Sequence, residues 1–78
     1  MRVHQVRNIK VFVNARGEHP PPHVHVLGPG WTVAIYIRSR ETRKGRGPLS
    51  DLREIKAWIK ENEDFLLRTW DELNERDH

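Results

Sequence analysis

Residues 23–37 read HVHVLGPGWTVAIYI, and this stretch decides the fold. In its first part Val24 and Val26 alternate with two histidines, which is the period of a strand buried on one face. Its last part, WTVAIYI, alternates in the same way. Between the two parts, Pro29 and Gly30 predict a type II turn in which Gly30 takes a positive φ. The stretch therefore predicts two strands joined by a tight turn.

The flanking residues extend this pattern on both sides. Upstream, Ile9, Val11 and Val13 alternate with polar or aromatic residues and predict another strand. Downstream, residues 41–44 predict a short edge strand that returns along its neighbour. The predicted sheet is antiparallel and small, with three to four strands within about residues 5–46.

The C-terminal part of the chain changes to helical spacing. Ser50 is a candidate N-cap, and Asp51 follows in the first turn, where the helix dipole favours an anion. Leu52 and later apolar residues then recur at helical intervals. Asn62 predicts a break between two helices, in preference to one bent helix.

These elements predict one α+β domain spanning residues 1–78. Its two C-terminal helices, within about residues 50–75, cover one face of the sheet. So short a chain has little core to spare, and we expect Trp58 and Trp70 to be buried. The strand alternation leaves six side chains on the open face of the sheet: Lys10, Phe12, His23, His25, Tyr36 and Arg38.

The composition narrows the class of protein. The chain has no cysteine, which excludes disulfides and thiolate metal sites. No segment approaches the roughly 18 apolar residues of a membrane span, so we expect a cytoplasmic protein without a membrane partner. The net charge of +3 hides an asymmetry, because residues 1–50 carry +7 and residues 51–78 carry −4. A basic half of this kind is typical of proteins that bind nucleic acid.

Most of these cations lie in one loop. Five of the nine residues from 38 to 46 are Lys or Arg, against one acid. Such a flexible cationic segment contacts phosphates in nucleic-acid-binding proteins, and a solvated loop without a ligand is the alternative. The predicted nucleic-acid-binding residues are Lys10, Tyr36, Arg38, Arg40, Arg43, Lys44 and Arg46.

Three histidines, His19, His23 and His25, stand around three consecutive prolines. His23 and His25 leave the same face of a strand, about 6.6 Å apart along it. Two imidazoles at this spacing can chelate Zn²⁺, Ni²⁺, Cu²⁺ or Fe²⁺. His19 lies roughly 12 Å upstream if the prolines are extended, so it joins such a metal site only if they turn back. Glu18 could supply a carboxylate ligand.

Two other interpretations of the histidines stay open. As acids and bases, His19, His23 and His25 would cleave a phosphodiester bond without a metal, because imidazole titrates near neutrality. Lys10 or Arg38 would then stabilise the charge that develops. Alternatively the histidines are structural, as polar strand residues beside prolines that keep an edge strand from pairing with other molecules.

Residues 18–26, EHPPPHVHV, followed by a turn with glycines and an alternating strand, resemble a bacterial family known as domain of unknown function 4160. The family pattern is an acidic residue, His, any residue, Pro-Pro-His, an apolar residue and often His, after an Ile/Val-rich first strand. Pro48-Leu49, Trp58 and the helix with Leu66, Leu67 and Trp70 continue the resemblance, which covers roughly residues 5–74.

The resemblance implies a small protein encoded beside another small protein in a toxin–antitoxin-like gene pair. It implies a partner from the neighbouring gene and a nucleic-acid target, and it assigns the family's histidines to His19, His23 and His25. One departure is the hairpin after the long strand. Residues 42–46, TRKGR, are strongly basic, whereas family members commonly carry an acidic or neutral hairpin there.

The leading hypothesis is a component of a toxin–antitoxin-like module that binds or cleaves nucleic acid, RNA in preference to DNA. It would use the open sheet face and the basic loop. Whether the protein is an enzyme stays open, and cleavage would make it a ribonuclease-like phosphodiesterase. A bound divalent transition metal and a homodimer also stay open. The competing hypothesis is a non-catalytic module that docks a partner protein, with histidines that are structural or metal-binding.

Overall fold

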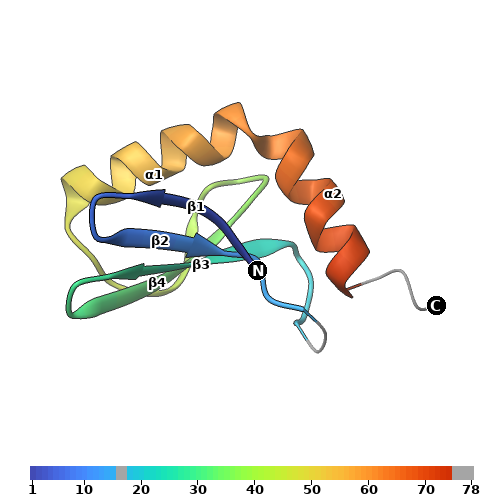
Figure 1. Ribbon diagram of the computed structural model, residues 1–78, viewed down its shortest axis with the longest axis horizontal. Helices are drawn as coiled ribbons and strands as arrows, with labels where there is room; N and C mark the ends of the chain where they lie inside the picture. The colour runs from blue at the N-terminus through green and yellow to red at the C-terminus, as the bar shows by residue number, and fades with distance from the viewer. Residues whose placement is uncertain (16–17, 75–78) are drawn as a thin grey trace.

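The computed structural model describes residues 1–15 and 18–74. Five strands form one sheet in their order along the chain, each antiparallel to its neighbour, and two helices follow (Figure 1). The elements are β1 (Arg2–Val6), β2 (Ile9–Phe12), β3 (His23–Gly28), β4 (Trp31–Tyr36), β5 (Thr42–Gly45), α1 (Leu49–Glu61) and α2 (Glu63–Asn74). The predicted α+β class is confirmed. No helix of the described residues is long and apolar enough to cross a membrane.

The sheet has five strands where the sequence predicted three to four, and β1 is the strand that was missed. Val3 and Val6 of β1 both pack against the core, although they are an odd number of positions apart. The pairing with β2 shifts register between Arg2 and His4. Such a bulge changes the phase of the side chains along a strand, so a search for strict alternation does not find it.

The predicted hairpin of β3 and β4 is confirmed. The two strands pair from His23 opposite Tyr36 to Gly28 opposite Trp31. Gly30 in the turn has a φ of 80°, as a type II turn requires. The predicted edge strand is also present, because β5 pairs with the outer side of β4.

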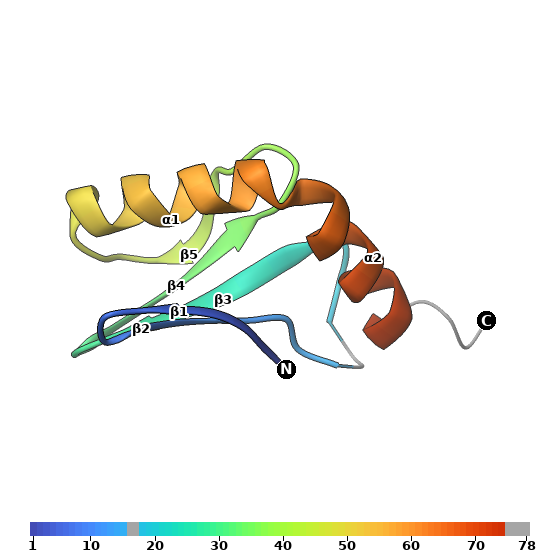
Figure 2. The same cartoon turned by 45° about the horizontal axis from the view of Figure 1, so that its top comes forward.

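The two helices take different positions against the sheet. Figure 2 shows α1 lying across one face, while α2 turns away and runs past the end of β3. This corrects the expectation that both helices cover the face. Trp70 is buried as predicted, whereas Trp58 is half-buried and stacks on His4 of β1, with ring centroids 4.2 Å apart. The core comprises Ile9, Val11, Val13, Val24, Val26, Val33, Ile35, Ile37, Leu52, Ile55, Ile59, Leu66 and Trp70.

Asn62 separates the helices, which confirms the predicted break. Its side-chain Nδ2 donates to the carbonyl oxygen of Trp58 at 2.9 Å, which occupies one of the acceptors left at the end of α1. Its own carbonyl oxygen accepts the N–H of Leu66 at 2.9 Å in the first turn of α2. The same residue thus ends one helix and begins the next.

The start of α1 differs from the prediction. The N-cap is Pro48 and not Ser50, and no side chain caps the helix. Asp51 does lie in the first turn, as predicted. Its carboxylate pairs with Arg7 from the turn between β1 and β2 at 3.1 Å, and Glu54 pairs with the same guanidinium at 2.7 Å. These exposed ion pairs tie the start of the helix to the sheet.

Candidate functional site

The sheet face away from α1 carries a row of side chains across four strands. Phe12 pairs with His25, His25 with Ala34, and Ala34 with Lys44 in the strand registers. Partners in register share a face, so these side chains cross the sheet next to one another. A shallow groove of about 550 Å³ lies over the row. Its polar lining consists of Asn14, His25, Thr32, Arg43 and Lys44.

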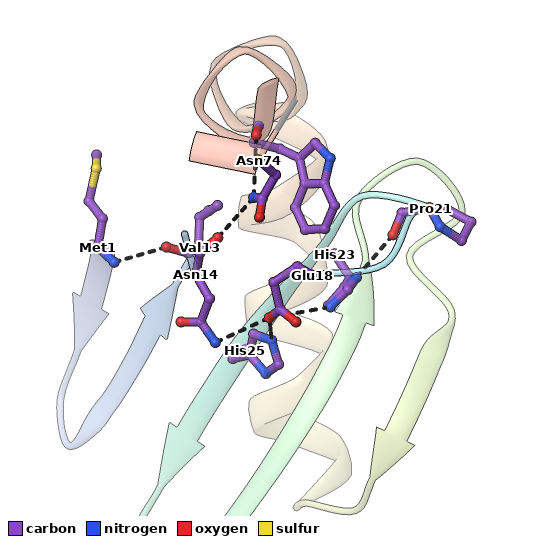
Figure 3. Close-up of polar contacts among 9 residues, drawn as sticks. Met1, Val13, Asn14, Glu18, Pro21, His23, His25 and Asn74 are labelled. Atoms are coloured by element: carbon purple, nitrogen blue, oxygen red, sulfur yellow. Dashed lines mark hydrogen bonds and ion pairs between the residues drawn. The ribbon is translucent and has the colours of Figure 1, made fainter. Parts of the chain in front are cut away.

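Glu18, His23 and His25 come together between His25 of this row and the start of β3, and they are called here the Glu–His–His cluster (Figure 3). The Nε2 atom of His25 lies 2.5 Å from Oε1 of Glu18, and the Nε2 atom of His23 lies 3.7 Å from the same oxygen. Asn14, which follows β2, donates from Nδ2 to this oxygen at 3.2 Å. One carboxylate oxygen is therefore the centre of the cluster.

His23 is buried, with 1% of its surface exposed. Its ring lies 5.0 Å from that of Trp70 in α2 and 6.4 Å from that of Tyr36, between centroids. Strand alternation predicted His23 on an open face, and this prediction is wrong because α2 and Trp70 cover that end of the sheet. His25 remains about 30% exposed at the groove.

The backbone of the proline segment fixes how the buried imidazole can act. Nδ1 of His23 lies 2.9 Å from the carbonyl oxygen of Pro21. A carbonyl oxygen only accepts hydrogen bonds, so Nδ1 is the donor and carries the proton of the neutral ring. The lone pair is then on Nε2, which points toward Glu18 (Figure 3). The proline segment, which comes directly before β3, therefore positions the imidazole of His23.

His19 does not join the cluster. Its side chain is exposed, and among residues 1–15 and 18–74 the ligand atoms that lie within 4.8 Å of one another belong to Glu18, His23 and His25. The chain does turn within the prolines, and the Pro20–Pro21 peptide bond is cis. The turn brings Glu18, which precedes His19 in the chain, to the imidazoles of His23 and His25. The sequence indicated both His19 and Glu18 as additional candidate ligands. In the structure, the carboxylate of Glu18 lies at the two imidazoles and His19 does not.

The predicted cations lie at different distances from the cluster. Lys10 pairs with Leu27, which lies on the same face two residues from His25, about 6.6 Å along the strand, and four residues from His23, about 13 Å along it. Arg40 forms an ion pair with Glu63 of α2 at 3.5 Å. Two of the predicted cations, Arg43 and Lys44, line the groove, whereas Arg38 and Arg46 are exposed outside its lining.

Sequence reasoning missed the residues that support the cluster. Asn14 holds the carboxylate, and Asn74 at the end of α2 donates to the carbonyl oxygen of Asn14 at 2.8 Å. Trp70 was assigned to the core, but nothing in its helical spacing placed it beside His23. These contacts join parts of the chain up to 60 residues apart, so no local pattern indicates them.

The pKa of Glu18 lies below its ordinary value. Burial of the carboxyl acts to raise the pKa, but the hydrogen bonds from His25 and Asn14 and the charge of His25 outweigh it. A carboxylate with a depressed folded-state pKa stabilises the fold above its unfolded-state pKa of about 4.3. This contribution is lost as the pH falls through the folded-state pKa.

We expect Glu18→Gln to lower the thermal midpoint of the metal-free protein more at about pH 5.5 than at about pH 3. The reason is that the stabilising contribution of the carboxylate decreases as the pH falls below its unfolded-state pKa of about 4.3, because the unfolded chain then takes up a proton more readily than the folded one. Circular dichroism melts in a chelating buffer measure the difference. A gap between the two proteins that stays constant over this range would show that the charge of Glu18 does not contribute to stability.

The fold and site define a class of small α+β protein, with a five-stranded antiparallel sheet, one helix-covered face and a Glu–His–His cluster beside the open face. Over residues 8–71 the chain matches the family described as Domain of unknown function (DUF4160), and it belongs to that family. The resemblance noted from residues 18–26 is thus confirmed. No curated protein and no solved structure matches the chain.

Proposed function

We propose that this protein binds single-stranded nucleic acid, RNA in preference to DNA, in the groove over its open sheet face. The observation that carries the proposal is the row from Phe12 to Lys44. It places the aromatic ring of Phe12 beside the imidazole of His25, and the cation of Lys44 beyond Ala34 on the same face. Proteins that bind single strands combine a basic groove with rings on which unpaired bases stack.

The charge of the groove supports a polyanionic ligand. Among residues 1–15 and 18–74, no carboxylate lies within 4.0 Å of the cationic groups of Arg43 or Lys44. In contrast, Arg7 and Arg40 are both occupied by ion pairs with helix carboxylates. The cations of β5 are thus available to phosphates, whose neutralisation releases counterions and favours binding at low salt.

The geometry supports binding better than cleavage. Metal-free phosphodiester cleavage by two imidazoles needs both at the substrate, within hydrogen-bond reach of the atoms that exchange protons. His25 is exposed at the groove, but His23 is buried under Trp70 and hydrogen-bonded to Pro21. His25 is therefore a binding residue in this proposal.

The cellular setting that the family resemblance implies belongs to the same proposal. We place the protein in the bacterial cytoplasm, beside a second small protein encoded by a neighbouring gene in a toxin–antitoxin-like pair. The acids of α1, which are Asp51, Glu54 and Glu61, lie on a helix across the sheet from the groove (Figure 2). The groove thus remains available to nucleic acid when a partner binds α1.

The test is a fluorescence-anisotropy titration with a labelled RNA of about 12 nucleotides, the length scale of single-strand sites. The double variant Arg43→Glu/Lys44→Glu should weaken binding by at least about tenfold at about 50 mM salt. Losing two phosphate contacts should also reduce the slope of log K against log salt by about 1.4.

The matched control changes the same charge on the opposite side of the molecule. Arg53→Glu/Lys60→Glu replaces two exposed cations of α1 and should leave the affinity within about twofold of the wild type. Equal losses of RNA affinity in the two double variants would show that only the net charge of the protein matters, and this result would contradict a site in the groove. The absence of any RNA binding by the wild type at low salt would also contradict a site in the groove. A matched DNA strand tests the preference for RNA.

A further inference from the structure

The donor atoms of the Glu–His–His cluster are arranged around a common centre. One ring nitrogen of His23, one ring nitrogen of His25 and one carboxylate oxygen of Glu18 all lie within 4.8 Å of one another. Donors bound at 2.0–2.1 Å to a tetrahedral ion are roughly 3.3 Å apart. The separation of 3.7 Å between His23 Nε2 and Glu18 Oε1 is close to this value. The shorter contact from His25 to Glu18 is a hydrogen bond, whose proton an ion would replace.

A second, independent observation comes from His23. Its Nε2 atom is buried and has no hydrogen-bond partner among the described residues. Because Nδ1 donates to the carbonyl oxygen of Pro21, the other nitrogen of the neutral ring, Nε2, is a hydrogen-bond acceptor, and no donor reaches its lone pair. An unpaired buried acceptor is costly, and native proteins rarely keep one without a reason. This lone pair is directed at the carboxylate that would share the ion.

The surroundings match those of a metal-binding histidine. Histidine ligands usually donate their other ring N–H to a carbonyl or carboxylate, which fixes the tautomer and the orientation of the ring. Pro21 provides this contact to His23. Asn14 likewise holds the carboxylate of Glu18. Trp70 and Tyr36 flank the His23 ring, so its metal-facing atom is shielded from water.

We propose that Glu18, His23 and His25 bind one divalent transition-metal ion, with Zn²⁺ as the best match to two imidazole nitrogens and one carboxylate oxygen. His19 is not a ligand. The ion ties Glu18, before the prolines, to the start of β3. The site shares His25 with the groove but includes neither Arg43 nor Lys44, and the metal proposal does not depend on nucleic-acid binding.

Isothermal titration of the chelator-stripped full chain with Zn²⁺ is the first test. We expect one ion per chain and a thermal midpoint that rises with free Zn²⁺, because an ion bound by the folded state stabilises it. Mg²⁺, which prefers oxygen ligands, should give neither effect. Substoichiometric Zn²⁺ binding, or binding without stabilisation, would overturn the proposal.

Variants then assign the ligands. His25→Ala and Glu18→Gln change partly exposed side chains and should each weaken Zn²⁺ binding by more than about 100-fold, beyond the loss typical of outer contacts. The matched control is His19→Ala, which removes an exposed histidine of the same segment and should bind like the wild type. Equal weakening in the His19 control, or full affinity in both ligand variants, would contradict the assignment.

The buried ligand needs a spectroscopic readout, because His23→Ala could lose stability for other reasons. Co²⁺ bound by the wild type should give visible absorption bands typical of four-coordinate nitrogen and oxygen ligation. His23→Gln, if folded by circular dichroism, should lose these bands, and if unfolded, the bands of His25→Ala decide the question. Bands that persist in every folded ligand variant would place the ion elsewhere.

Discussion

Replacing Trp70 with alanine should remove about 3–5 kcal/mol of the free energy of unfolding. The side chain is 1% exposed and packs both on the core and on the ring of His23. A domain of this size has a total stability of about 4–12 kcal/mol, so this substitution should bring the protein close to unfolding. Chemical denaturation monitored by circular dichroism gives the midpoint and the slope.

The matched control lies on the same helix. Phe65→Ala removes an aromatic ring that is 39% exposed, and it should cost less than about 1 kcal/mol. The comparison separates burial from helix propensity, because both changes replace an aromatic residue with alanine in α2. Similar costs for the two variants would mean that α2 does not pack on the end of the sheet as described.

Gly45→Ala should cost more than a change of backbone preference alone, and it should loosen β5. Gly45 has a φ of 93°, and an added Cβ would stand 2.2 Å from the carbonyl oxygen of Thr32 in β4. That oxygen belongs to the backbone, so the contact is relieved only by separating the two strands. The cost therefore combines the strain of a positive φ with overpacking, about 2–4 kcal/mol in all.

Gly30→Ala provides the comparison for this prediction. Gly30 has a φ of 80° in the β3–β4 turn, but an added Cβ would meet nothing within 4 Å. Gly30→Ala should therefore lower the free energy of unfolding only by the strain of the positive φ, about 1–2 kcal/mol. Hydrogen exchange should show faster opening of the β5 amides in Gly45→Ala only. Equal costs, with β5 equally protected, would show that β5 is not held closely against β4.

Local sequence patterns predicted the parts of the fold that depend on local chemistry. The alternation in β3 and β4, the glycine of their turn and the break at Asn62 are properties of neighbouring residues. The register shift in β1 is not, because it depends on how Arg2 and His4 pair with β2. The pattern of the five residues of β1 alone gives no sign of it.

In the candidate site, too, local sequence patterns predicted some features, and tertiary packing determines the others. The same-face relation of His23 and His25 follows from their spacing by two along a strand. The burial of His23 depends on α2, which starts 40 residues later and turns at Asn62 to bring Trp70 over the ring. The choice of Glu18 over His19 depends on the path of the connector, which spacing within residues 18–26 leaves open. Both corrections come from tertiary packing.

The central claim is that the open sheet face binds single-stranded RNA. Its most direct test is a titration of the ¹⁵N-labelled protein with a single-stranded RNA of about 12 nucleotides at low salt, followed by amide chemical shifts. The largest shifts should fall on the row across the four strands and on β5, at Phe12, His25, Ala34 and Lys44. Shifts confined to α1 or α2, or no shifts at saturating RNA, would contradict the claim.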